Sequence, residues 1–190
     1  MADRKLILSM QMTLDGFVAG PNDSMDWMQN SEEEWKEMLS ELQDADTFLL
    51  GRKMYPGYSQ YWQSVLKNPA GDKNEFAFAK LAEKTQHIVF TTRDFQPDWN
   101  NTRVAHNLER EITSLKKQPG KNIIAWGGAN FGSNLINSGM LDEIRLVINP
   151  VILGKGKWLF DSVDNRSGLE LIESKQMRKG ILLVRYKVKQ

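Results

Sequence analysis

A glycine and two cations, Gly51-Arg52-Lys53, followed by Met54, stand between an apolar run and a segment of helical character. Free backbone N–H groups at the start of a helix bind phosphate, and nearby Arg and Lys side chains strengthen that binding. This segment is therefore a candidate phosphate site. The alternative is a tight turn whose two charges are solvated.

A second candidate is the run Trp126-Gly127-Gly128-Ala129-Asn130-Phe131, which joins a predicted strand to a predicted helix. Adjacent glycines let the backbone approach a ligand closely and expose N–H groups to a pyrophosphate. Ala129 stands where the Rossmann fingerprint has its second glycine, and the chain has no Walker lysine motif. The run is therefore either a phosphate cradle of another fold or a turn without a ligand.

Two hydroxyls and a guanidinium, Thr91-Thr92-Arg93, directly follow a predicted strand that ends at Phe90. Such a group at the carboxyl end of a strand could hold a ribose 2′-phosphate and so favour NADP over NAD. The simpler interpretation is a capping turn.

Three carboxylates, Asp15, Asp26 and Glu32, bracket the segment after the first predicted strand. Each is a candidate for holding a substrate or donating a proton, although most surface carboxylates do neither. Trp27 could line a pocket for a flat ring, whereas core packing suits Trp35 better.

Predicted strands and helices alternate through most of the chain, and the candidate residues lie where they join. The strands are predicted at residues 6–12, 47–50, 87–91 and 123–126. Helices are predicted from Ser31, from Arg52 to about residue 65 with an interruption near Pro56-Gly57, and at residues 74–84, 108–117 and 130–137. This alternation predicts a mostly parallel sheet covered on both faces, with ligand sites at the carboxyl ends of the strands.

The last part of the chain changes character. Residues 143–149, 151–153, 169–175 and 181–187 resemble successive strands separated by turns. We therefore expect a three-layer α/β/α fold whose central sheet is mixed, with antiparallel members added to a mostly parallel sheet.

Composition narrows the class of protein. A length of 190 residues suits one domain, residues 1–190, and 25 basic against 24 acidic residues give no footprint for nucleic acid. The chain has no cysteine, which excludes disulfides and fits a cytoplasmic location, and its two histidines lack a metal-ligand pattern. The charged N-terminus and its short apolar run predict neither a signal peptide nor a membrane span.

The strand-to-helix turns, in this order, resemble those of the dihydrofolate reductase superfamily, and more closely the reductase domain of riboflavin biosynthesis. The resemblance spans essentially the whole chain. It is carried by residues 13–19, 51–53, 91–93, 127–129, 141–145 and 150–156, of which the last block is the most specific.

The resemblance implies roles for the candidate residues. The helix starting at Arg52 and the turn at Gly127-Gly128 would hold the phosphates of NADPH, and Thr91, Thr92 and Arg93 would surround its 2′-phosphate. Val18 and Ala19 would lie near the nicotinamide. Asp15, Asp26 and Trp27 would contact substrate, and Glu32 falls near the buried acid of the folate enzymes.

These implications predict an NADPH-dependent reductase of a small pterin-, pyrimidine- or riboflavin-precursor-like heterocycle, active as a homodimer because the similar reductase domains pair through their sheets. The chain has no counterpart of the arginine that clamps the folate tail, which disfavours dihydrofolate itself. Two alternatives remain: a non-catalytic NADP-binding protein and a structural dimerisation module on the same fold.

Overall fold

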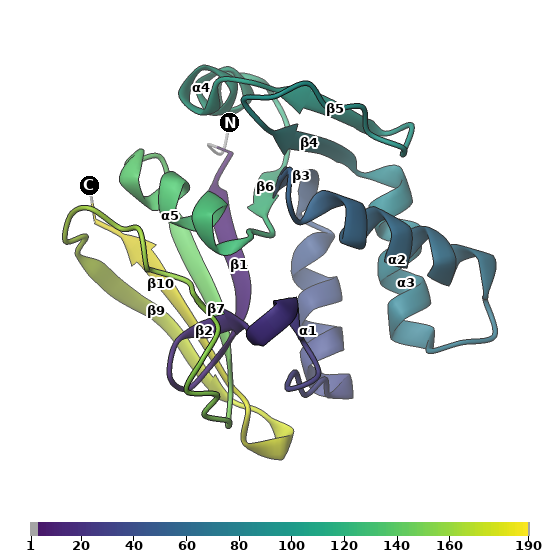
Figure 1. Ribbon diagram of the computed structural model, residues 1–190, viewed down its shortest axis with the longest axis vertical. Helices are drawn as coiled ribbons and strands as arrows, with labels where there is room; N and C mark the ends of the chain where they lie inside the picture. The colour runs from purple at the N-terminus through teal and green to yellow at the C-terminus, as the bar shows by residue number, and fades with distance from the viewer. Residues whose placement is uncertain (1–3, 190) are drawn as a thin grey trace.

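The computed structural model describes residues 4–189; residues 1–3, which belong to the charged N-terminal segment, and residue 190 lie outside the described part. Figure 1 shows three layers, with a twisted sheet between two groups of helices. The eight strands of the sheet follow the order β5-β4-β3-β6-β1-β7-β10-β9.

Six neighbouring strands of the sheet run parallel, and the antiparallel members lie at one edge. The parallel strands are β5 (Thr102–Ala105), β4 (Gln86–Phe90), β3 (Ala45–Gly51), β6 (Asn122–Ala125), β1 (Leu6–Thr13) and β7 (Glu143–Asn149). β10 (Leu182–Val188) is antiparallel to both of its neighbours, β7 and β9 (Leu169–Gln176). The prediction of a mixed, mostly parallel sheet is confirmed.

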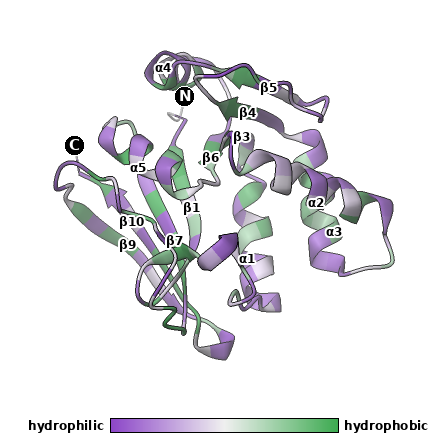
Figure 2. Ribbon diagram, viewed as in Figure 1, coloured by the Kyte–Doolittle hydropathy of each residue, from purple (hydrophilic) through white to green (hydrophobic). Residues whose placement is uncertain are grey.

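Five α-helices in the described part of the chain cover the two faces of the sheet. α1 (Glu32–Leu42), α2 (Tyr55–Lys67) and α3 (Lys73–Lys84) pack on one face, and α4 (Leu108–Lys117) and α5 (Ala129–Asn137) pack on the other. Successive side chains of β1 point to opposite faces of the sheet, so this strand contributes to the hydrophobic core on each face. Ile7 faces the first group of helices, while Leu6 and Leu8 face the second. In Figure 2 the central strands are mainly hydrophobic and the helices carry both kinds of residue.

Short elements complete the fold on the side where the strands end. β2 (Phe17–Ala19) pairs with β8 (Lys157–Trp158) in a separate two-stranded sheet, and η1 (Pro21–Asp23) follows β2. A second single-turn helix, η2 (Arg178–Gly180), joins β9 to β10. The sequence did not predict β2, β5 or β8. β2 and β8 have three and two residues, which is too short to show a periodic pattern.

Two predicted features are wrong. α2 runs without interruption from Tyr55 because Pro56 lies in its first turn, where the missing N–H of proline costs no hydrogen bond. Residues 151–153 are not a strand. Their backbone bonds to the turn after β1 instead, with Leu153 N–H donating to the carboxylate of Asp15.

No helix among residues 4–189 is long and apolar enough to cross a membrane.

Candidate functional site

The carboxyl ends of β3, β4 and β6 are joined at one edge of the sheet. Gly51 N–H donates to the carbonyl oxygen of Gly127 at 3.1 Å, and Arg52 N–H donates to the carbonyl oxygen of Phe90 at 3.2 Å. Two of the three predicted segments therefore touch directly, and the third begins immediately after Phe90.

Two glycines at this edge allow the close approach. A Cβ on Gly51 would lie 3.1 Å from the Cβ of Phe131. Gly127 has a φ of +85°, and a Cβ there would lie 2.3 Å from the sulfur of Met10. Gly128 differs, because a Cβ on it would meet nothing within 4 Å. The backbone at Gly128 therefore faces open space.

The start of α5 presents free hydrogen-bond donors to that space. The N-cap is Gly128, which has no side chain to cap the helix, and the first intrahelical bond runs from Gly132 N–H to Gly128 at 2.9 Å. The N–H groups of Ala129, Asn130 and Phe131 therefore have no acceptor within the helix. Such a terminus fits the oxygens of a pyrophosphate.

The cations of the first segment lie beside this terminus, but not in a helix. α2 begins at Tyr55, so Arg52, Lys53 and Met54 form a turn, and the predicted helix start at Arg52 is wrong by three residues. Arg52 is half-buried and Lys53 is exposed. Neither of them, nor Arg93, forms an ion pair with a carboxylate among residues 4–189.

The third segment forms a turn, as the simpler of its two interpretations predicts. Thr91 is a capping residue, because its hydroxyl accepts a hydrogen bond from Arg93 N–H at 3.1 Å. Thr92 and Arg93 are exposed. A shallow hollow beside them is lined by Asp94, Phe95, Gln96, Val104 and His106.

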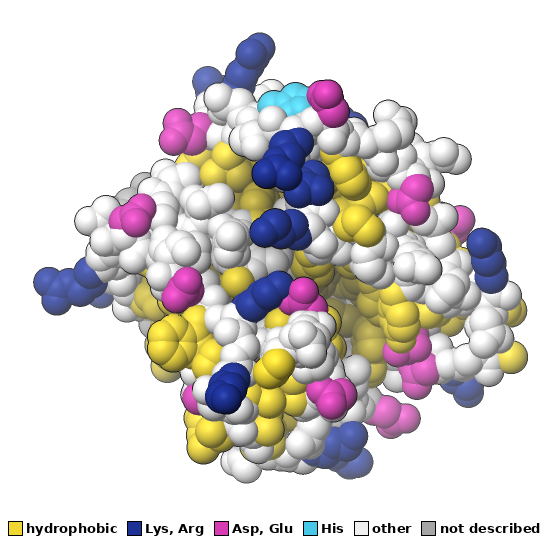
Figure 3. All heavy atoms as spheres, viewed as in Figure 1, with side chains coloured by type: hydrophobic (Ala, Val, Ile, Leu, Met, Phe, Trp, Pro, Cys, Tyr) yellow, Lys and Arg dark blue, Asp and Glu magenta, His cyan; other side chains and the backbone are white. Residues whose placement is uncertain are grey.

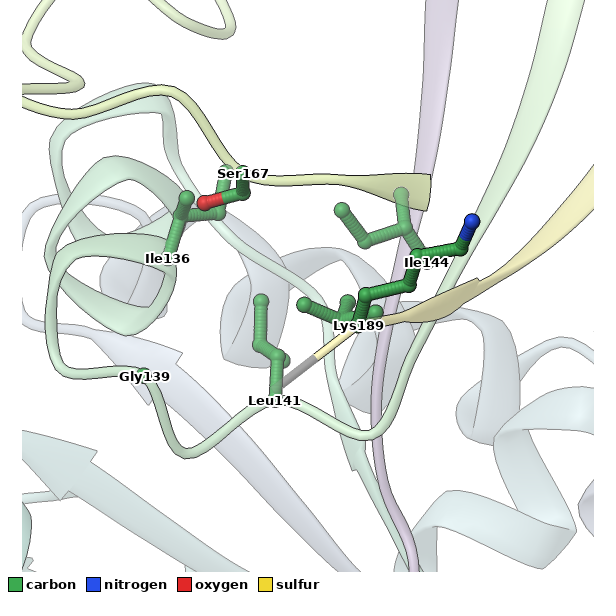
Figure 4. Close-up of a pocket in the computed structure, with 7 residues that line it drawn as sticks. Ile136, Gly139, Leu141, Ile144, Ser167 and Lys189 are labelled. Atoms are coloured by element: carbon green, nitrogen blue, oxygen red, sulfur yellow. The ribbon is translucent and has the colours of Figure 1, made fainter. Parts of the chain in front are cut away.

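The surface view agrees with this arrangement. Figure 3 shows Lys and Arg side chains gathered over the region where β3 and β4 end, and a hollow lined by hydrophobic side chains between η1 and α2. The hollow in Figure 4, lined by Ile136, Gly139, Leu141, Ile144, Ser167, Val188 and Lys189, lies elsewhere. It sits at the amino end of β7, away from the predicted site residues.

Asp15 anchors a loop. Its carboxylate accepts hydrogen bonds from the Thr13 hydroxyl at 2.6 Å, from Leu153 N–H at 3.1 Å and from Gly154 N–H at 2.8 Å. Desolvation acts to raise the pKa of Asp15, but these hydrogen bonds outweigh it and lower the pKa overall. Asp15 is therefore held as a carboxylate, which is a poor proton donor.

The other predicted substrate residues lie apart from one another. Asp26 and Glu32 are exposed. Trp27 is buried, and its indole N–H donates to the carbonyl oxygen of Ser24 at 3.2 Å. Of the residues expected near the nicotinamide, Val18 is buried and Ala19 is half-buried. The expectation that Glu32 is the buried acid is wrong, because its side chain points to solvent.

The buried acid of this region is Glu34, with 4% of its surface exposed. Its Oε1 accepts a hydrogen bond from Gln11 Nε2 at 2.9 Å, whereas its Oε2 is buried and has no hydrogen-bond partner among residues 4–189. Burial raises the pKa of Glu34, and the positive charge of Arg145 partly opposes that shift. A carboxyl group with a raised pKa and an unused oxygen is suited to hold a proton.

Helical phase explains why Glu34 and not Glu32 is buried. Ser31 caps α1 by accepting a hydrogen bond from Glu34 N–H at 3.1 Å. Glu34 then lies four and eight residues before Met38 and Leu42, on the inward face. The apolar spacing along α1 is the sequence signal from which the burial of Glu34 could have been predicted.

Two amides connect Glu34 to β7. Asn149 Nδ2 donates to Gln11 Oε1 at 3.0 Å, and Gln29 N–H donates to Asn149 Oδ1 at 2.8 Å. Neither Gln11 nor Asn149 is recognisable as a site residue from the sequence, since single amides carry no pattern.

Comparison with known proteins identifies the family of this chain. The sequence profile of the RibD C-terminal domain matches residues 4–183. The uncharacterized protein YyaP of Bacillus subtilis (strain 168) is 34% identical over 184 residues, which cover 96% of this chain and 94% of that protein.

Solved structures share the fold at low sequence identity. A putative riboflavin biosynthesis protein from Shewanella sp. PV-4 has a TM-score of 0.74 and 16% identity, covering 98% of this chain and 99% of that one. Dihydrofolate reductase from Enterococcus faecalis, complexed with NADP(H), has a TM-score of 0.65 and 14% identity, covering 98% and 97%. The predicted dihydrofolate-reductase-like three-layer fold is confirmed, and the chain belongs to the RibD C-terminal domain family.

Proposed function

We propose that this protein is an NADPH-dependent reductase that transfers a hydride to a small pterin-, pyrimidine- or riboflavin-precursor-like heterocycle. The observation that carries the proposal is the uncapped start of α5, which faces open space at Gly128 next to the turn of Arg52 and Lys53. Neither cation forms an ion pair among residues 4–189. Backbone donors and free cations that converge on open space are suited to a polyanionic cofactor.

The residues present fit NADPH. Gly127, Gly128 and the N–H groups that begin α5 would hold the pyrophosphate, with Gly51, Arg52, Lys53 and Met54 beside it. Thr92 and Arg93 would bind the 2′-phosphate, while Thr91 keeps their turn in shape through its bond to Arg93. Val18 and Ala19 would lie near the nicotinamide, and the bound cofactor would supply the hydride.

Substrate would bind near α1, where the buried polar side chains gather. Reduction of a C=N or C=O bond by hydride requires one proton at the nitrogen or oxygen. Glu34 takes the role of proton donor expected for Glu32, since its carboxyl group is buried and one oxygen is free. Asp26 and Trp27 belong to the flanking loop, and Asp15 supports the site by holding residues 153 and 154.

The same cofactor site would also serve a non-catalytic NADP-binding protein, which remains the alternative. A cytoplasmic location and a homodimer are part of the proposal.

The first experiment is a titration with NADPH and then NADH, followed by quenching of tryptophan fluorescence. Trp126 adjoins Gly127, so a nucleotide at α5 should change the emission of this residue. We expect saturable binding with preference for NADPH. The Arg93→Ala variant should lose at least about tenfold in NADPH affinity and change little with NADH, because only NADPH carries the 2′-phosphate.

An exposed arginine provides the matched control. Arg166→Ala removes the same charge at an exposed position outside the predicted segments and should leave both affinities unchanged. Absence of binding by either nucleotide would refute the proposed function. Binding without turnover of any pterin, flavin precursor or pyrimidine tested would favour the non-catalytic alternative.

A further inference from the structure

A row of ion pairs lies on the face of the sheet that α1 covers. Glu41 of α1 bonds Arg145 of β7 through Nε at 2.7 Å and Arg185 of β10 through Nη2 at 2.7 Å. Glu143 then bonds Arg185 at 2.8 Å and Lys5 at 2.7 Å. Three cations alternate with two carboxylates, so this row of ion pairs carries one positive charge in excess. Arg145 forms the buried end of the row.

Arg145 has hydrogen-bonding capacity that the ion pairs do not use. It is 3% exposed. Within the described part of the chain its Nη2 is buried without a hydrogen-bond partner, as is Oε2 of Glu34. The remaining nitrogen, Nη1, donates to the Ser9 hydroxyl at 3.4 Å, while Gln11 donates to Glu34 at 2.9 Å. Ser9 and Gln11 point to the same face of β1, so Arg145 and Glu34 lie over successive positions of one strand.

The guanidinium group of Arg145 attracts the carboxylate of Glu34 and lowers its pKa, although no ion pair within 4 Å joins the two side chains. Charges separated by buried protein interact more strongly than exposed charges do, because little water screens them. The excess positive charge of the row of ion pairs therefore stabilises the carboxylate form of Glu34.

We propose that Arg145 and Glu41 are positioning residues that set the protonation state of Glu34. Arg145 stabilises the carboxylate form of Glu34, and Glu41 limits this effect by neutralising the guanidinium group. The inference rests on the proposed function for its purpose: when Glu34 gives its proton to the reduced nitrogen or oxygen of the substrate, the carboxylate left behind is stabilised by Arg145. Water then returns a proton to Glu34.

Other charged groups near Glu34 are exposed or already paired. From α1 these are Glu32, Glu33 and Glu37; from β9 and η2 they are Lys175, Arg178 and Lys179. Lys175 bonds Glu37 at 2.7 Å and Glu33 at 3.6 Å, and Lys179 bonds the carbonyl oxygen of Asn30 at 2.8 Å. Because solvent screens these groups, the buried Arg145 is the cation that Glu34 senses most strongly.

The test is a carbon-13 NMR titration of the whole protein labelled at glutamate side-chain carboxyl carbons, without nucleotide or substrate. Glu34→Gln identifies the Glu34 signal by its loss. We expect the midpoint of Glu34 to rise in Arg145→Met and to fall in Glu41→Gln, with the two variants separated by about one pH unit or more. Arg145→Lys, which keeps the charge, should restore a midpoint close to that of the unmodified protein.

Glu37→Gln is the matched control, because it makes the same change on the same helix at a solvent-screened ion pair. It should leave the midpoint of Glu34 nearly unchanged. If Arg145→Met does not fold, Glu41→Gln and Arg145→Lys still test the sign and the charge requirement. Equal midpoints in all folded variants, or a shift in Glu37→Gln as large as that in Glu41→Gln, would overturn the inference. Since no nucleotide is present, failure of NADPH binding would not affect this result.

Discussion

Two adjacent glycines show how neighbouring residues can have different tasks. Gly127 has a φ of +85°, and a Cβ there would lie 2.3 Å from the sulfur of Met10. Gly128 has open space around the position of a Cβ. The fold therefore requires glycine at position 127, whereas a ligand would require it at position 128.

This difference yields a paired prediction. Gly127→Ala should lower the free energy of unfolding by about 1–3 kcal/mol, because alanine is strained at that φ and crowds Met10. Gly128→Ala should leave stability nearly unchanged yet weaken NADPH binding by more than about tenfold, since its methyl group would stand between the backbone and the phosphates. Thermal unfolding and the fluorescence titration measure the two effects.

A third glycine serves as control. A Cβ on Gly57, in α2, would also meet nothing within 4 Å, so Gly57→Ala should preserve both stability and binding. Unchanged NADPH affinity in Gly128→Ala would show that the pyrophosphate does not bind at the start of α5.

His87 predicts how stability depends on pH. Its Nδ1–H donates to the carbonyl oxygen of Thr85 at 2.9 Å, and its Nε2 accepts from the Tyr58 hydroxyl at 3.0 Å. Burial is the main cause that lowers the pKa of His87 from 6.5 to about 4, and the bond to Thr85 opposes it only partly. The ring is therefore neutral in the folded protein at pH 7.

The unfolded chain binds a proton at His87 more readily than the folded one. The contribution of neutral His87 to the free energy of unfolding is therefore fully present above pH 6.5 and is lost as the pH falls toward 4. The loss from this residue should reach about 3 kcal/mol. Urea unfolding at pH 7 and at pH 4.5 measures it. In His87→Gln, which does not titrate there, the two pH values should differ less; an equal difference would assign the pH dependence to other groups.

At the scale of elements, the start of α1 decides which acid faces the sheet. Ser31→Ala removes the bond from Glu34 N–H to the Ser31 hydroxyl, and we expect it to cost about 1 kcal/mol in the free energy of unfolding. Chemical denaturation measures the loss. Ser31→Asp should restore the cap, and Ser40→Ala, at an exposed position of the same helix, should cost nothing. Equal stability of Ser31→Ala and Ser40→Ala would contradict this role.

At the scale of the whole molecule, β9 is one of the two edge strands of the sheet and its large apolar residues are exposed. Leu169, Leu171 and Ile172 are 41%, 54% and 50% exposed. An edge strand with apolar side chains invites pairing with another strand. We therefore expect the proposed homodimer to form through β9.

Leu171→Glu should convert the dimer to a monomer, because it places a charge at the centre of that interface. Light scattering during size-exclusion chromatography gives the mass in solution. Ile152→Glu makes the same change in an exposed loop outside β9 and should keep the dimer. A monomeric unmodified protein would refute the dimer, and an unaffected dimer in Leu171→Glu would place the interface elsewhere.

Periodic patterns in the sequence predicted most elements of this fold. In long segments such as α4 and β1, apolar and polar residues recur with a period clear enough to predict a helix or a strand. The pattern failed at Pro56, which begins a helix it was expected to interrupt, and at residues 151–153, which hydrogen-bond to the turn after β1. Both errors come from contacts or capping that a local pattern does not contain.

The sequence alone was enough to predict the three turns rich in glycine, cations and hydroxyls, their order, and the mixed α/β sheet that carries them. These properties depend on local residue types and on spacing along one segment. The packing of distant segments is what makes Asp15 hold a remote loop and makes Arg145 the buried end of a row of ion pairs. Each depends on partners more than 100 residues away in the sequence, whose distance and burial no local pattern records.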